Sequence, residues 1–234
     1  MSLNKFKNEL KKAGSKKNAE ILQWFFKTGR GEYGEGDKFL GIKIPEIRKI
    51  AKKNKKITFP EIHKALKSKH HEERLAALLI LVDSYSSGNE KTKEDIARFY
   101  LKNTKYINNW DLVDLTAPKI LGKHLIDRDR KILTKLAHSE NLWEKRISIV
   151  STFEFIRAKQ FSDTLKISRI LLKDEHDLIH KAVGWMLREI GKRSMETEEN
   201  FLLKHYKKMP RTMLRYAIEK FPEKKRRAYL EGRI

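Results

Sequence analysis

The stretch Lys145-Arg146-Ile147-Ser148-Ile149-Val150 recurs in varied form along the chain and decides its fold class. It aligns with Glu73-Arg74-Leu75-Ala76-Ala77-Leu78, His180-Lys181-Ala182-Val183-Gly184-Trp185 and Leu214-Arg215-Tyr216-Ala217-Ile218-Glu219. The basic residues at 146, 181 and 215 are 35 and 34 residues apart, and the gap from 74 to 146 is 72, about two such periods. This period is typical of solenoids built from two-helix repeats.

The rest of the sequence also reads as helices of modest length that end at Gly, Pro or small polar residues, without alternating strand patterns. Short connections such as 86–89 predict antiparallel neighbours, and therefore an all-α stack of helical hairpins. We expect helices over about 3–13, 15–28, 45–54, 60–68, 71–85, 90–103, 109–123, 128–138, 141–158, 162–173, 176–191, 196–208, 211–220 and 223–230.

The repeat that the alignment skips should have its equivalent residue near position 111, within Asn109-Trp110-Asp111-Leu112-Val113-Asp114-Leu115-Thr116-Ala117-Pro118. If this stretch is helical, Trp110 and Asp114 lie on one face, one turn apart. Pro118 lacks an N–H, so a helix through it leaves the carbonyl of Asp114 without its usual partner. Asp111, nearer the helix N-terminus, suits a capping or structural role, whereas Asp114 is open to a structural or a catalytic reading.

Second helices of stacked pairs commonly line the concave surface of a solenoid. On that basis Trp110, Asp114 and Trp185 are predicted to face one groove with a stripe of phosphate-binding residues: Arg74, Arg146, Lys181 and Arg215. A core-facing column would show the same spacing, although cores rarely hold four basic residues. The remaining aromatic residues at helical spacings are read as core: Trp24, Phe25, Phe26, Trp143, Phe153 and Phe155.

The composition indicates a nucleic-acid partner. The 234 residues include 53 Lys and Arg against 31 Asp and Glu, a formal charge of +22, which favours binding to nucleic acid, although a solvated lysine-rich surface fits the count too. Cys is absent, which excludes disulfides and favours a reducing compartment. No apolar run has signal or membrane-spanning length, so we expect a soluble, cytoplasmic protein without membrane contact.

Three other patterns are weaker signals. Gly29-Arg30-Gly31-Glu32-Tyr33-Gly34 spells a dinucleotide-loop pattern, but it follows a predicted helix and carries acidic residues, so we expect a flexible connection. The pairs His70-His71 and His176/His180 lack further ligands for a metal and are expected to be solvated or capping residues. The scattered Ser and Thr residues show no nucleophile-elbow pattern.

The sequence resembles the DNA alkylation repair family of HEAT-like DNA glycosylases, the AlkD family, over nearly its whole length. The resemblance lies in residues 31–45, in Asn109-Trp110-Asp111-Leu112-Val113-Asp114, in Trp143-Glu144-Lys145-Arg146 and in residues 181–192. It implies a single domain over 1–234, a right-handed superhelix of HEAT-like hairpins with a concave basic groove, and excision of cationic N3- or N7-alkylated purines from double-stranded DNA. The family's catalytic aspartate matches Asp114, its lesion-facing tryptophans match Trp110 and Trp185, and a DNA-contacting arginine matches Arg146.

The resemblance further implies a monofunctional glycosylase, acting as a monomer without metal or other cofactor and without a pocket for an extruded base. The alternative from a different class is a non-catalytic repeat protein that binds DNA or RNA. A scaffold that binds acidic proteins is a third reading, because similar solenoids serve as scaffolds.

Overall fold

The computed structural model describes residues 2–234, and the helices occur close to where the sequence predicts them. Within these residues no strand forms, and only an isolated bridge joins Lys38 and His70. The all-α prediction is therefore confirmed. No helix among residues 2–234 combines the length and the apolar character needed to cross a membrane.

The chain divides into two compact units, one ending at Thr116 and one beginning at Ala117. The first contains α1 (Leu3–Lys12), α2 (Lys16–Phe25), α3 (Ile44–Lys53), α4 (Phe59–Leu66), α5 (His71–Ser87), α6 (Glu90–Lys102), a 3-10 turn (Thr104–Tyr106) and nearly all of α7 (Trp110–Ala117). The second contains a π-helical turn (Pro118–Gly122), α8 (Lys123–Leu125), α9 (Lys131–Ala137), α10 (Leu142–Ser151), α11 (Phe153–Arg157), α12 (Ser162–Ile170), α13 (Asp177–Gly191), α14 (Met195–His205), α15 (Arg211–Ala217) and α16 (Glu223–Leu230).

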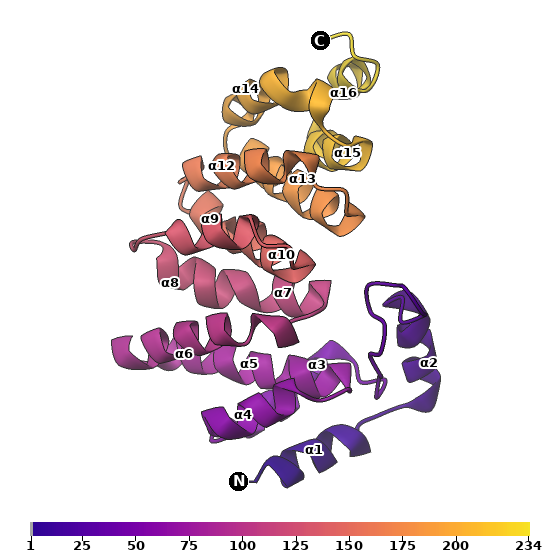
Figure 1. Ribbon diagram of the computed structural model, residues 1–234, viewed down its shortest axis with the longest axis vertical. Helices are drawn as coiled ribbons and strands as arrows, with labels where there is room; N and C mark the ends of the chain where they lie inside the picture. Colours follow the sequence, from indigo (N-terminus) through magenta and orange to yellow (C-terminus); the bar gives the residue numbers. More distant parts are fainter. Residues whose placement is uncertain (1) are drawn as a thin grey trace. The chain divides into compact units, whose positions relative to one another are not determined.

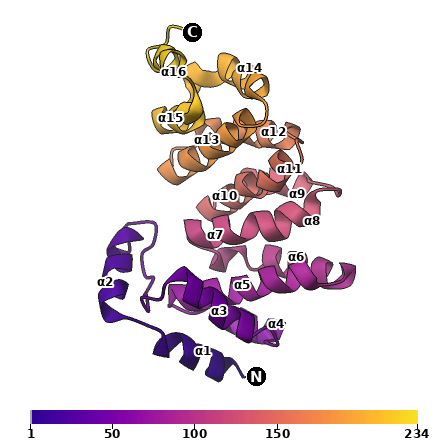
Figure 2. The ribbon, with the colours of Figure 1, turned by 180° about the vertical axis from the view of Figure 1, so that it is seen from behind.

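In the first unit α5 is the central helix. Every residue from His71 to Val82 is buried, because the run 75–82 is apolar on all sides and other helices cover it. The helices α3, α4 and α6 pack against α5, and α1 packs against α3 and α5 (Figure 1). By contrast α2 buries none of its residues fully and stands at the side of this stack in both views (Figure 2).

In the second unit the helices that carry the repeated basic residues pack in succession, α10 on α13 and α13 on α15. Their partners α9, α12 and α14 form the other layer (Figure 1). Gly184 lies where α13 meets α15, and a Cβ there would come within 2.5 Å of the Met213 carbonyl oxygen and of Tyr216 Cβ. The 34–35-residue period of the sequence thus corresponds to stacked helices.

Two boundaries differ from the prediction. The helix expected over 109–123 changes at Pro118 to a π-helical turn, at the position where proline removes a backbone donor. The helix expected over 141–158 is interrupted at Thr152, whose hydroxyl donates to the carbonyl of Ile149 at 2.7 Å; such local bonds compete with the regular helix. The superhelix, its handedness, the concave groove and the single domain over 1–234 stay predictions.

Candidate active site

Trp110 and Asp114 lie one turn apart on α7, as the sequence predicts, and both line the same cavity. The side chain of Asn109 fixes the start of this helix, because its Oδ1 accepts the backbone N–H of Trp110 at 2.8 Å. Both Trp110 and Asp114 are half-buried. The predicted aromatic and carboxylate pair is therefore brought together at the surface of one cavity.

The cavity has a volume of about 270 Å³ and lies within the first unit. Its walls come from α2, the loop before α3, and α3, α5 and α7, and they are mostly apolar. Three carboxylates and one imidazole interrupt the apolar lining: Glu72, Asp111, Asp114 and His71. Acidic groups among aromatic and aliphatic walls suit a ligand that has an apolar surface and develops positive charge.

The indole of Trp110 is held by an aromatic stack. It stacks on Phe26 with ring centroids 5.2 Å apart, and Phe26 in turn stacks on Phe39 at 5.0 Å. The indole and the Phe25 ring form an edge-to-face pair with centroids 6.0 Å apart. The indole Nε1–H donates to the Tyr33 hydroxyl at 3.3 Å. These contacts fix the ring plane beside Asp114, since aromatic pairs at such separations attract one another.

A buried charge network lies beneath this stack. His71 Nε2 contacts Asp111 Oδ2 at 2.8 Å, and His71 Nδ1 lies 3.5 Å from Asp37 Oδ2. Arg74 donates to the same Asp37 oxygen at 2.6 Å, and the side-chain amide of Asn109 approaches it at 3.4 Å. The network thus joins the loop at Asp37, the first turn of α5 and the start of α7.

Burial alone would lower the pKa of His71, but the charge and hydrogen bond of Asp111, together with the hydrogen bond of Asp37, outweigh it and raise that pKa above its ordinary value of 6.5. Burial likewise opposes ionisation of Asp37, yet the hydrogen bond of His71 and the charge of Arg74 hold the pKa of Asp37 below its usual 3.8. The network therefore favours an imidazolium and an ionised Asp37. Asp111 is a structural carboxylate near the helix N-terminus, as predicted.

Glu72 anchors the loop that forms one wall. It is 1% exposed, and its carboxylate accepts the backbone N–H groups of Leu40 at 2.9 Å, Gly41 at 2.7 Å and Ile42 at 3.2 Å. Gly41 has a φ of +81°, in the region where glycine is favoured, and a Cβ there would lie 2.1 Å from the Ser15 carbonyl oxygen. The three backbone N–H groups and the Glu72 carboxylate thus hold the loop before α3 against the first turn of α5.

The predicted phosphate-binding residues separate into two groups. Arg74 is 3% exposed and bonded to Asp37, so the prediction that it contacts phosphate is wrong; it is the cation of the buried network. Arg146 is 5% exposed and donates to the carbonyl of Leu178; its contact with phosphate stays a prediction. The other two are accessible. Lys181 is half-exposed beside Asp177 at 2.6 Å, and Arg215 is exposed.

Trp185 lies on α13 in the second unit. Its side chain is half-buried and its ring lies 5.8 Å from that of Phe153. Trp110 therefore belongs to the first unit and Trp185 to the second. The prediction that Trp110, Asp114 and Trp185 face one groove stays a prediction.

The histidines were expected to be solvated or capping residues, and His71 differs from that expectation. His176 caps α13 by accepting the N–H of Leu178 at 3.1 Å, as expected. His71 is neither solvated nor capping, because it is 2% exposed within the network. Residues 2–234 contain no group of three or more His, Cys, Asp or Glu side chains arranged to hold a metal ion.

The loop after α2 is not a dinucleotide loop. The N–H of Gly29 donates to the Glu32 carboxylate and that of Gly31 to the Glu35 carboxylate, each at 2.8 Å. Carboxylates of the chain itself thus occupy donors that a nucleotide phosphate would need.

The core prediction for the aromatic residues is wrong at α2. Trp24 is 82% exposed and Phe25 is 52% exposed, because α2 presents them outward from the side of the stack. The prediction is confirmed for Phe26, Trp143 and Phe155, which are buried, while Phe153 is half-buried.

Sequence reasoning missed His71, Glu72 and Asp37 as parts of the site. One signal was present: His71-Glu72-Glu73-Arg74 leads directly into the apolar run 75–82. A helix that is apolar on all sides is buried on all sides. Charged residues in the turn that leads into it are therefore buried too and need partners of opposite charge. The partner Asp37 is distant in sequence and gave no such signal.

Comparison with known proteins agrees with this geometry. The family model for DNA alkylation repair enzymes matches residues 6–221. A solved structure described as a predicted DNA alkylation repair enzyme from Enterococcus faecalis has the same fold, with a TM-score of 0.68 at 15% identity over 90% of this chain and 97% of that one. No curated protein matches. Because the family model spans almost the whole sequence, this chain belongs to the family of DNA alkylation repair enzymes.

Proposed function

We propose that this protein is a monofunctional DNA glycosylase that excises cationic N3- and N7-alkylated purines from double-stranded DNA. The observation that carries the proposal is the position of Asp114 beside Trp110 in one mostly apolar, acidic cavity. The π-helical turn at Pro118, directly after α7, is a type of irregularity common at functional sites.

The chemistry follows from the charge of the lesion. An N3- or N7-alkylated purine already carries a positive charge, so it leaves the sugar without protonation and the site needs no general acid. As the glycosidic bond breaks, the deoxyribose becomes oxocarbenium-like. The Asp114 carboxylate stabilises that developing charge and orients the attacking water, and the reaction yields the free base and an abasic site.

The tryptophans and cations complete the proposal. The faces of Trp110 and Trp185 pack against the sugar and backbone at the lesion and attract the developing cation. Arg146, Lys181 and Arg215 neutralise phosphates, so binding is expected to weaken steeply with salt. Arg74 has no part in this contact, since it is bonded to Asp37 inside the first unit. We place the protein, as a monomer, in the bacterial cytosol or nucleoid.

The proposal is tested by incubating the protein with duplex DNA containing 7-methylguanine and separating the products. The expected products are free 7-methylguanine and an intact strand with an abasic site, cleaved only after alkali treatment. Salt-sensitive binding without base release from any alkylated duplex would instead identify a non-catalytic DNA-binding protein.

A further inference from the structure

One loop holds the start of α7. Tyr33 and Asp37 both lie in the loop between α2 and α3, and they contact successive residues at the start of the helix. The Tyr33 hydroxyl accepts the indole Nε1–H of Trp110 at 3.3 Å, and Asp37 Oδ2 accepts from the side-chain amide of Asn109 at 3.4 Å. The loop thus contacts both residues that begin the helix of Asp114.

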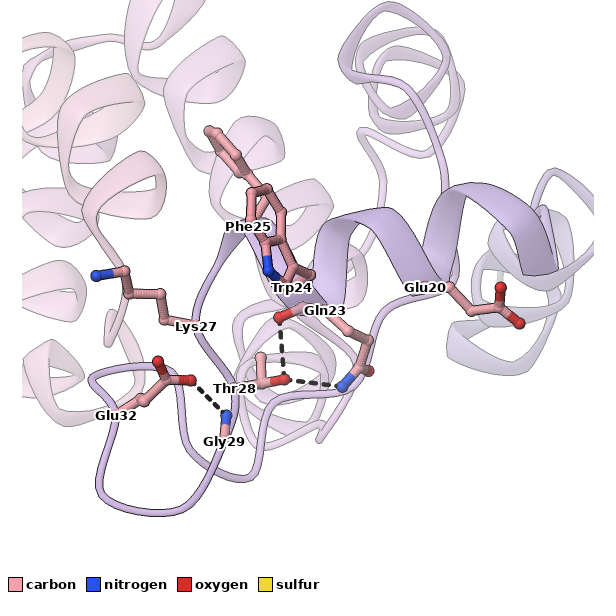
Figure 3. Close-up of a pocket in the computed structure, with 8 residues that line it drawn as sticks. All are labelled: Glu20, Gln23, Trp24, Phe25, Lys27, Thr28, Gly29 and Glu32. Atoms are coloured by element: carbon pink, nitrogen blue, oxygen red, sulfur yellow. Dashed lines mark hydrogen bonds between the residues drawn. The ribbon is translucent and has the colours of Figure 1, made fainter.

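Hydrogen bonds within the loop fix its first part. Gln23 Nε2, near the end of α2, donates to the Thr28 hydroxyl at 2.9 Å, and this hydroxyl donates to the Gln23 carbonyl at 3.1 Å. The Gly29 N–H donates to the Glu32 carboxylate at 2.8 Å. Figure 3 shows these bonds at the end of α2. The loop is therefore ordered by its own groups up to the residue before Tyr33, and DNA does not have to order it on binding.

Backbone bonds hold the loop where Tyr33 lies. The N–H of Gly34, the next residue, donates to the carbonyl of Lys27 at 3.1 Å, and the N–H of His71 donates to the carbonyl of Lys38 at 2.8 Å. The first bond ties the loop to the end of α2, and the second ties it to the first residue of α5. Tyr33 therefore approaches the indole from a fixed backbone, as a side chain that positions another group must.

The hydrogen bond and the aromatic stack constrain the indole in different ways. Phe26 lies against Trp110 with ring centroids 5.2 Å apart and an interplanar angle of 19°, and this contact fixes the plane of the ring. A tryptophan has two preferred orientations about its Cβ–Cγ bond, which keep nearly the same plane but exchange the two edges of the ring. Only one of them points Nε1–H at the Tyr33 hydroxyl. Tyr33 therefore selects between two orientations that stacking alone does not distinguish.

The orientation matters for the reaction because the indole lines the same cavity as Asp114. The two orientations place the six-membered ring on opposite sides of the Cβ–Cγ bond. The face of that ring attracts a cation, so its distance from the developing positive charge differs between them. A misplacement of about 1 Å can cost about 10²-fold in rate. The orientation of Trp110 is therefore expected to affect the rate of base release more than the affinity for DNA.

We propose that Tyr33 is a positioning residue of the glycosylase, whose hydroxyl holds the Trp110 indole in the orientation that faces the deoxyribose at Asp114. This inference rests on the proposed glycosylase function, and it extends that function to a loop that the sequence indicated only as a flexible connection. Tyr33 acts through Trp110 and does not itself touch the reacting atoms. Loss of its hydroxyl therefore slows base release and leaves DNA binding unchanged.

Two measurements on matched variants test the proposal. The variants are Tyr33→Phe, Trp110→Phe and the combination of the two, compared with wild type. The control is Tyr106→Phe, because Tyr106 is a half-buried tyrosine of the same unit that does not line the cavity, and its ring lies 5.6 Å from that of His63. Each Tyr→Phe change thus removes one hydroxyl and keeps the ring.

The first measurement is single-turnover release of 7-methylguanine from duplex DNA, with binding of the same duplex followed by fluorescence anisotropy. The second is the ¹H–¹⁵N NMR signal of the Trp110 Nε1–H, which is identified as the indole signal that Trp110→Phe lacks. The NMR signal reports the hydrogen bond itself and does not depend on activity.

Tyr33→Phe should slow base release roughly fivefold, equivalent to about 1 kcal/mol, the scale of one neutral hydrogen bond, with the dissociation constant for DNA unchanged. The Trp110 Nε1–H signal should move and exchange faster with solvent, while the signals of the other tryptophans stay in place. The double variant should release base at the rate of Trp110→Phe, because phenylalanine has no Nε1–H for the hydroxyl to accept. Tyr106→Phe should match wild type in both measurements.

Base release at the wild-type rate by Tyr33→Phe would overturn the proposal, as would an equal loss when Tyr33→Phe is added to Trp110→Phe. A parallel loss of DNA binding would make Tyr33 a DNA contact and overturn it as well. Failure of the proposed function is recognised separately, because wild type would then release no 7-methylguanine. In that case the NMR signal still reports whether Tyr33 holds Trp110.

Discussion

Replacement of Asp37 by Asn tests whether the buried network supports the site. The Asp37 carboxylate lies 2.6 Å from the Arg74 guanidinium, and these two side chains are 6% and 4% exposed. Asp37→Asn removes the negative charge and leaves the cations of Arg74 and His71 buried with less compensation. Removing one partner of such a pair costs about 3–5 kcal/mol, and the low exposure leaves little solvent screening to reduce that figure.

The expected effect is a large shift in urea unfolding. With a slope of about 2 kcal/mol per molar urea, a loss of about 4 kcal/mol lowers the unfolding midpoint of the first unit by about 2 M. Circular dichroism follows the helices, and tryptophan fluorescence reports the stack around Trp110. The control is Asp129→Asn, because Asp129 is 65% exposed in its pair with Lys131 and should show no measurable shift.

A midpoint that moves by less than about 0.3 M in Asp37→Asn, equivalent to less than about 0.6 kcal/mol, would refute the reasoning. It would mean that the Arg74 charge is compensated by other groups, and that the network does not hold the first turn of α5 against the start of α7.

Three further changes are predicted. The raised pKa of His71 makes its stabilising effect complete below pH 6.5 and lost as the pH rises through that raised value. The difference in urea stability between wild type and His71→Gln should therefore shrink as the pH rises above 6.5, and a constant difference would contradict the charged ring. Glu72→Ala leaves three buried backbone donors without their acceptor and should cost about 1–3 kcal/mol, with faster proteolysis in residues 27–42; unchanged proteolysis would contradict the anchoring role. Gly184→Ala places a Cβ 2.5 Å from the Met213 oxygen and should destabilise the second unit by about 1–3 kcal/mol in thermal unfolding, whereas Lys181→Ala on the same helix should not.

The sequence predicts the helices well because their signals are local. Each signal acts within a few residues. Asn141 caps the start of α10, α5 ends just before Gly88, and the apolar run 75–82 lies inside α5. The adjacency of Trp110 and Asp114 was predictable for the same reason, since it follows from one turn of a single helix.

Contacts between distant segments were not predictable in this way. Arg74 occupies the predicted register, yet periodicity does not reveal whether a side chain faces solvent or a counter-ion such as Asp37. Trp24 and Phe26 have the same helical, aromatic context in the sequence, and one is 82% exposed while the other is 6% exposed. The difference depends on where α2 stands beside the stack, which no local pattern encodes.

The catalytic role of Asp114 is tested most directly by single-turnover release of 7-methylguanine by wild type and Asp114→Asn, with binding of the same duplex measured in parallel. If Asp114 stabilises the oxocarbenium-like sugar, Asp114→Asn should release base about 10²–10³-fold more slowly while it binds DNA as wild type does. Base release at the wild-type rate would contradict the account.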